Sequence, residues 1–170
     1  IAFTPPRKPL IAAVEGYALA GGFEAMLVCD LAVAARDAQF GIPEAKRGLV
    51  AAAGGLLRLP RLIPPRIAME LALTGDMISA ERAAQYGLVN LVTEPGEALT
   101  EAKKLAARII CNAPLSVAAS KRVINEQSDW SLDERFERQR AITDPVNASA
   151  DAREGSAAFA EKRPANWQGV

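Results

Sequence analysis

The chain has 170 residues, of which half are hydrophobic and about a quarter are charged, as is ordinary for one globular domain with a real core. Its 20 basic and 20 acidic side chains cancel, so no excess of positive charge favours nucleic-acid binding. No apolar run reaches the roughly 18 residues that a transmembrane helix needs, and we therefore expect no membrane segment.

The first 95 residues alternate between predicted strands and helices, which predicts an α/β fold. In chain order we expect a strand in KPLIAAVEG, a turn at Gly21-Gly22, a helix and then a strand in FEAMLVCDLAVAA, a short strand in AQFGIP, and a helix in AAAGGLLRLPRLI broken by Pro60 and Pro64. PPRIAMELALTG has Pro65 at a helix start and Gly75 just past its end, SAERAAQYG is a helix capped by Ser79, and GLVNLV is a strand.

Helices dominate the sequence after Pro95. Three amphipathic helices are predicted in residues 97–112, 114–127 and 131–142, and a last one in 151–163. Ser131 and Glu134 have the spacing of a capping box. We divide the chain into residues 1–95, which are mixed α/β, and residues 96–170, which are helical, as two parts of one protein.

The complete absence of histidine restricts the chemistry that the chain can perform. It excludes catalysis by Ser-His-Asp or Cys-His groups and most zinc sites, so we expect no metal. Acid–base work must then fall to Glu, Asp, Lys, Tyr or Cys. Cys29 and Cys111 are expected to be reduced core thiols of a cytosolic protein rather than a disulfide.

Glu24 is the first candidate for a catalytic role, because it is the only acid in the stretch ALAGGFEAMLV. Backbone N–H groups near Gly21 and Gly22 at a helix start carry partial positive charge and are unshielded, which is the build of an oxyanion hole. The alternative is that Glu24 only favours the helix N-terminus by its charge, while the glycines permit tight helix packing.

Glu44 is the second candidate, because it follows a strand end at Pro43 and could face the same pocket as Glu24. Two such carboxylates can share general acid and base work on one substrate. The alternatives are that Glu44 pairs with Lys46 or Arg47, or is simply exposed.

Two further stretches are weaker candidates for binding. AAAGG, residues 51–55, could approach a ligand closely, although a close helix–helix contact explains it equally well. FAEKRPANW places Lys162 and Arg163 beside Phe159 and suits a phosphate-rich ligand, although basic residues also favour a solvated helix C-terminus.

The order of these motifs along the chain is itself informative. KPLIAAVEGYALAGGFE, CDLAVAARDAQFGIPEAKRG, AAGGLLRLPRLI, ALTGDMISAERAAQYGLVN and FAEKRPANW resemble, collinearly and over nearly the whole chain, the enoyl-CoA hydratase/isomerase (crotonase) family. The resemblance implies a ββα spiral core followed by a helical region that builds a trimer or a dimer of trimers. It implies a cytoplasmic lyase of fatty acid metabolism that needs no cofactor, because coenzyme A is part of the substrate.

The resemblance also implies a mechanism and site residues. Water would add syn to a trans-2-enoyl-CoA to give a 3-hydroxyacyl-CoA. The Gly21 N–H would bind the thioester oxygen, Glu44 would protonate the α-carbon, and Glu24 would bind and help to activate the water. Lys162 and Phe159 are the expected contacts of the CoA part of the substrate.

The sequence departs from the family pattern in two places. Ala51-Ala52-Ala53 precedes Gly54-Gly55 where the family usually has Pro-Gly-Ala, which could alter acyl preference. The tail and the LRLP run are similar to carnitinyl-CoA dehydratase-like members, which raises a branched or hydroxylated acyl substrate as an alternative. The family's early strands and its second oxyanion donor precede Ile1, so we expect a longer natural protein. A second alternative is therefore a non-catalytic acyl-CoA-binding or assembly subunit.

Overall fold

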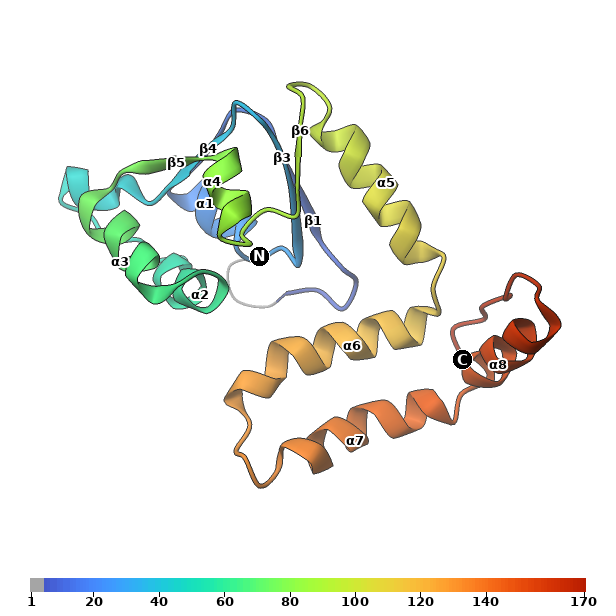
Figure 1. Ribbon diagram of the computed structural model, residues 1–170. Coiled ribbons are helices and arrows are strands. Elements are labelled where there is room, and N and C mark those ends of the chain that lie inside the picture. Colours follow the sequence, from blue (N-terminus) through green and yellow to red (C-terminus); the bar gives the residue numbers. More distant parts are fainter. Residues whose placement is uncertain (1–4) are drawn as a thin grey trace. The chain divides into compact units, whose positions relative to one another are not determined.

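A computed structural model describes residues 5–170 (Figure 1). The chain forms two compact units. The core unit consists of residues 5–6 and Leu10–Leu105, and the helical unit consists of Arg7–Pro9 and Ala106–Val170. The division at about residue 95 expected from the sequence stays a prediction about the two functional parts.

The core unit contains two three-stranded sheets. The first has the order β1-β3-β6 and is parallel throughout, with strands Ile11–Val14, Leu31–Ala35 and Leu91–Thr93. The second has the order β2-β4-β5, in which β2 (Tyr17–Leu19) is parallel to β4 (Gln39–Gly41), and β5 (Met77–Ser79) is antiparallel to β4. The central strand β3 reads LAVAA and is buried after its first residue, as is typical of a parallel strand covered on both faces.

Helices of the core unit follow the strands in the α/β order predicted from the sequence. They are α1 (Gly21–Met26), the 3₁₀ helix η1 (Pro43–Arg47), α2 (Gly55–Leu62), α3 (Pro65–Thr74) and α4 (Ala80–Gln85). Gly75 adopts the left-handed conformation that ends α3, and the Ser79 hydroxyl caps α4 by accepting from the Arg82 N–H.

The sequence reading is wrong at several points in this unit. Pro60 does not break α2, which runs through it to Leu62. A proline removes one backbone donor, but Pro60 lies near the end of a short helix whose packing against α3 outweighs that loss. The three-residue strands β2 and β5 were not expected, because such short strands carry no readable alternation. Gly21-Gly22 forms the first turn of α1 rather than a separate turn.

The main hydrophobic core lies between the strands and the helices of the core unit. Its largest fully buried side chains include Phe23 of α1, Phe40 of β4 and Leu59 of α2. The Phe23 and Phe40 rings are tilted with their centroids 6.1 Å apart, a favourable aromatic arrangement. This packing fixes the start of α1 and the end of β4, which are the two places that carry Glu24 and Glu44.

The helical unit consists of the end of α5 (Ala98–Ile110), then α6 (Pro114–Glu126), η2 (Gln127–Asp129), α7 (Arg135–Asn147) and α8 (Ala150–Glu161). The predicted capping box is half formed, because the Glu134 N–H donates to Ser131 Oγ at 3.3 Å while the Glu134 carboxylate pairs with Arg138 instead. Helix α7 also continues past the expected end at Ile142, through Pro145.

The residues after α8 fold back onto that helix. Asp151 is buried in its first turn and accepts hydrogen bonds from the Gln168 and Gly169 N–H groups at 2.7 and 2.9 Å. Glu154 binds Arg163 through both carboxylate oxygens. Carboxylates on α8 therefore hold the last segment in place.

Neither cysteine forms a disulfide, as expected, but Cys111 is exposed and Cys29 is only half-buried, so neither is a true core thiol. Between residues 5 and 170, none of the helices has the length and the apolar character needed to cross a membrane.

Candidate active site

Glu24 is almost fully buried in the first turn of α1, with 4% of its surface exposed. Its Oε1 atom accepts hydrogen bonds from the peptide N–H groups of Ala53 and Gly55, both at 2.8 Å. The carboxylate on this apolar stretch thus binds the start of α2, as well as lying in the first turn of its own helix.

Gly55 lies directly against this carboxylate. A Cβ atom on Gly55 would lie 2.9 Å from Cγ and 3.0 Å from Oε1 of Glu24, so a side chain there has no room. The AAAGG stretch thus makes a close contact with the Glu24 side chain, which was not expected, and its close approach to a ligand stays a prediction.

Gly21 begins α1 directly after a strained residue. Ala20 has φ 51° and ψ −128°, a region that disfavours residues with a side chain. The Ala20 N–H donates to the Gly41 carbonyl at 3.1 Å and anchors the turn to β4. Within residues 5–170 the Gly21 N–H makes no hydrogen bond, so it is available as a donor.

The alternative that the glycine pair permits tight packing finds no support in the described chain. A side chain on Gly21 or Gly22 would meet no atom within 4 Å. These positions border open space, which is what a backbone donor to a bound ligand requires.

Glu44 lies in η1, directly after Pro43. Its Oε2 atom is buried and has no hydrogen-bond partner among the described residues. The expected alternative, pairing with Lys46 or Arg47, is wrong: Lys46 Nζ binds Asp76 Oδ1 at 2.6 Å and lowers the pKa of Asp76 by that hydrogen bond. Buried polar atoms are nearly always satisfied, so an unsatisfied carboxylate oxygen marks a place for a ligand or a proton.

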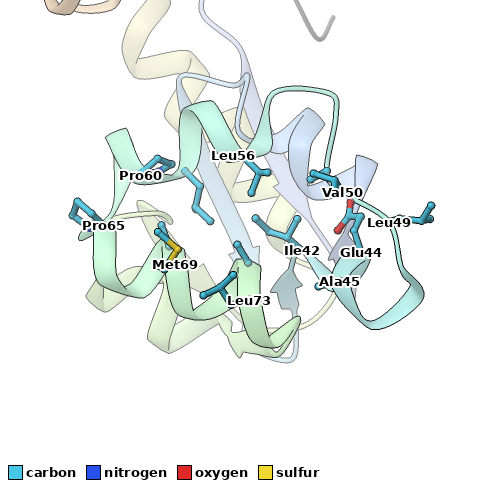
Figure 2. A pocket seen from close by; sticks show the side chains of 14 residues that line it. Ile42, Glu44, Ala45, Leu49, Val50, Leu56, Pro60, Pro65, Met69 and Leu73 are labelled. Atoms are coloured by element: carbon cyan, nitrogen blue, oxygen red, sulfur yellow. The ribbon is translucent and has the colours of Figure 1, made fainter.

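A pocket of about 470 Å³ opens beside Glu44 (Figure 2). Among the described residues that line it, Glu44 has the only polar side chain, and all the others are aliphatic residues, prolines or methionine. The lining residues are Ile42, Glu44, Ala45, Leu49, Val50, Ala51, Leu56, Leu59, Pro60, Pro65, Ala68, Met69, Ala72 and Leu73. An apolar pocket of this size with one placed carboxylate has the form of a site for a small ligand.

The segment from Ala51 to Leu56 links the two carboxylates. Its Ala53 and Gly55 N–H groups bind Glu24, and its Ala51 and Leu56 side chains line the pocket that contains Glu44. Glu24 itself is not among the residues that line the pocket. Neither the donors to Glu24 nor the strain at Ala20 was predicted from the sequence, although the Gly54-Gly55 pair was a signal for the close approach.

Lys162 and Phe159 belong to the helical unit. Phe159 is 87% exposed on α8, and Lys162 ends that helix in the left-handed conformation at φ 54°. Arg163 binds Glu154 and Glu161, and its hydrogen bonds to Glu154 lower the pKa of that carboxyl to about 2. That Lys162 and Phe159 contact the CoA part of the substrate stays a prediction.

The described residues offer no ready metal centre. From residue 5 to residue 170, no three Asp, Glu or Cys side chains gather closely enough to hold an ion. The chemistry that the site offers is a carboxylate held by two backbone donors, a second carboxylate in an apolar pocket, and a free N–H at a helix start.

Comparison with known proteins agrees with this architecture. A family model described as enoyl-CoA hydratase/isomerase matches residues 3–170. The crystal structure of an enoyl-CoA hydratase from Mycobacterium marinum is 63% identical, with a TM-score of 0.98 over 99% of this chain and 67% of that chain. One from Mycobacterium tuberculosis is 60% identical, also with a TM-score of 0.98, over 99% of this chain and 67% of that chain.

A carnitinyl-CoA dehydratase from Salmonella arizonae is 45% identical over 167 residues, which are 96% of this chain and 64% of that protein. The chain thus spans about 64% of the length of the curated relatives that it matches. The matches in sequence and in structure all point to one family: the chain belongs to the enoyl-CoA hydratase/isomerase family and has the crotonase fold.

Proposed function

We propose that the protein is an enoyl-CoA hydratase, which adds water syn to a trans-2-enoyl-CoA and forms a 3-hydroxyacyl-CoA. The observation that carries the proposal is Glu44, whose buried Oε2 atom has no partner among the described residues and lies beside an apolar pocket. A carboxylate so placed is suited to exchange a proton with a carbon atom of an apolar substrate.

The second carboxylate is suited to the water. Glu24 Oε1 is occupied by the Ala53 and Gly55 N–H groups, which hold the side chain in one orientation. Its Oε2 accepts no hydrogen bond within the described chain and can bind the attacking water. Glu24 then takes a proton from that water as the hydroxyl oxygen bonds to the β-carbon.

The remaining steps concern the α-carbon and the thioester oxygen. As the hydroxyl adds, charge moves from the double bond to the thioester oxygen, where the Gly21 N–H stabilises it. Glu44 delivers a proton to the α-carbon on the same face, which completes the addition. The addition of water is redox-neutral overall and needs no redox cofactor. Coenzyme A takes part only as the thioester group of the substrate.

The second candidate is dehydration of a hydroxylated acyl-CoA, as the name of the Salmonella carnitinyl-CoA dehydratase describes. The 45% identity over 96% of this chain supports it. Hydration and dehydration are the two directions of one reaction, so the same two carboxylates would serve both.

The proposal extends to the assembly and the location of the protein. We place Lys162 and Phe159 at the CoA part of the substrate, and we place the protein in the cytoplasm as a trimer or a dimer of trimers. Large exposed apolar side chains on the helical unit, among them Ile124, Phe136 and Phe159, support an assembly that covers them. Two cysteines that form no disulfide suit a reducing compartment.

The test is hydration of crotonyl-CoA in D₂O, followed by the loss of the conjugated-thioester absorbance and by mass analysis of the product. A hydratase gives a 3-hydroxyacyl-CoA with one deuterium at the α-carbon, and Glu24→Gln and Glu44→Gln each slow the reaction by about 10²–10⁴-fold. A product without the hydroxyl group, or no turnover with any enoyl-CoA, would refute the proposal.

A further inference from the structure

The pocket beside Glu44 carries more information than a general acyl site, because its lining restricts what can enter. Its far end, opposite Glu44 in Figure 2, is formed by Pro60, Pro65 and Met69, while Leu73 and Leu56 line the space between. The whole path away from the carboxylate is therefore apolar.

We infer that the substrate of the proposed hydratase is an enoyl-CoA with an unsubstituted hydrocarbon chain of medium length, and not one with a short or a charged acyl group. This inference rests on the proposed function, which supplies the thioester and the place of the reacting carbons beside Glu44. What it adds is the class of acyl group and the residue that limits its length.

The volume of the pocket argues for the length. At roughly 30 Å³ for a water-sized group, about 470 Å³ holds on the order of a dozen methylene-sized groups. A four-carbon crotonyl group leaves most of that space unfilled. A chain of about eight to ten carbons would instead cover the apolar side chains along the pocket, which favours binding through the hydrophobic effect.

The chemistry of the lining argues against a charged acyl group. A quaternary ammonium group, such as that of a carnitinyl chain, is bound by aromatic faces or by a carboxylate. The described lining residues include no aromatic side chain, and Glu44, the only acid among them, is engaged in catalysis. Along this pocket a trimethylammonium group would meet only apolar side chains, which offer it no favourable contact in place of water.

Met69 is the residue we assign to the length limit. It lies on α3 at the far end of the pocket, and its side chain is more than half exposed, so a larger residue fits without disturbing the core. Leu57 on α2 is a control, because it is also an exposed apolar residue, at 75% against 59% for Met69, and it does not line the pocket.

The experiment uses the protein at its natural length. It measures kcat/KM for the hydration of trans-2-enoyl-CoAs of four, six, eight and ten carbons, and for the dehydration of carnitinyl-CoA. We expect kcat/KM to rise by up to about fourfold for each added methylene until the pocket is filled. Carnitinyl-CoA should be at least about 100-fold poorer than the best enoyl-CoA. Met69→Trp should lower the ten-carbon to four-carbon ratio at least about tenfold, and Leu57→Trp should leave that ratio unchanged.

Titration calorimetry with saturated acyl-CoAs of the same lengths separates the two proposals. Affinity that rises with chain length in a protein without turnover would refute the proposed function, and only the preference of the pocket for medium-length acyl chains would stand. Turnover that is flat or falls beyond four carbons would overturn the inference alone, as would carnitinyl-CoA turnover within about tenfold of the best enoyl-CoA. Failure of both turnover and length-dependent affinity would overturn both.

Discussion

The core unit and the helical unit each contain a carboxylate with buried oxygen atoms, Glu44 and Asp151, and the two carboxylates have opposite surroundings. In the helical unit, Asp151 is 2% exposed and its two oxygens accept the Gln168 and Gly169 N–H groups. In the core unit, the buried Oε2 of Glu44 has no partner among the described residues and borders a pocket.

Glu24 is intermediate between these two cases, because one of its oxygens is fixed by two N–H groups while the other accepts nothing within the described chain. A fully satisfied buried carboxylate contributes to stability, whereas an unsatisfied one costs stability and is retained for function. The comparison therefore predicts that substitutions of Glu44 and Asp151 separate activity from stability.

The largest effect is expected for Glu44→Gln. We expect kcat for enoyl-CoA hydration to fall by about 10²–10⁴-fold, because a neutral amide cannot deliver the proton. The free energy of unfolding should not decrease, because Oε2 makes no hydrogen bond that the substitution could remove. Urea unfolding beside the thioester absorbance assay checks both parts. A fully active variant, or a markedly destabilised one, would contradict the contrast with Asp151.

The next effect concerns the fixed oxygen of Glu24. In Gly55→Ala the new methyl group would lie 2.9 Å from Glu24 Cγ, so the carboxylate must leave its two donors. We expect a loss of about 1–3 kcal/mol in stability together with a clear loss of kcat. The control is Gly22→Ala, which meets no atom within 4 Å and should not lower the unfolding free energy. Equal stability of the two variants would show that Gly55 does not constrain Glu24.

Asp151→Asn tests the satisfied carboxylate. An amide presents a donor where the Gly169 or the Gln168 N–H needs an acceptor, and we expect a loss of about 1–3 kcal/mol in the free energy of unfolding. Glu161→Gln, which alters an exposed ion pair, should change it by no more than about 0.5 kcal/mol. If both variants unfold at the same urea concentration, the buried hydrogen bonds of Asp151 contribute little.

Much of the fold could be predicted because its signals are local. Pro65 and Gly75 mark the ends of α3, Ser79 caps α4, and the apolar run LAVAA forms β3. The strands β2 and β5 could not be predicted, because three residues show no alternation and are defined only by pairing with the distant strand β4.

The candidate site could be predicted only in part, for a similar reason. Glu24 and Glu44 stood out as acids at element ends, but each position taken alone favoured a plain structural role. The contacts that distinguish them join residues far apart in the sequence, since Glu24 binds N–H groups 29 and 31 positions later. Only the three-dimensional structure shows that Glu44 Oε2 has no hydrogen-bond partner among the described residues. The same holds for the hydrogen bond from Lys46 to Asp76, which removes Lys46 as a partner of Glu44.

The smallest effect is a pH dependence in the exposed part of the helical unit. Arg163 and the Asn166 N–H lower the pKa of Glu154 from 4.5 to about 2 in the folded protein. Because the folded pKa is the lower one, the stabilisation is fully present above pH 4.5 and is lost as the pH falls towards 2.

The fluorescence of Trp167 reports on this segment in a Trp130→Phe background, since these are the two tryptophans of the chain. Its indole N–H donates to the Cys111 carbonyl, and its ring packs against Gly155 of α8, so release of the tail changes its surroundings. We expect Glu154→Gln to weaken the tail at neutral pH and to reduce the further change between pH 4.5 and 2. Glu161→Gln keeps the Glu154 pair and should keep the acid transition. Identical acid profiles with and without Glu154 would mean that the buried Asp151, and not the exposed ion pair, holds the tail alone.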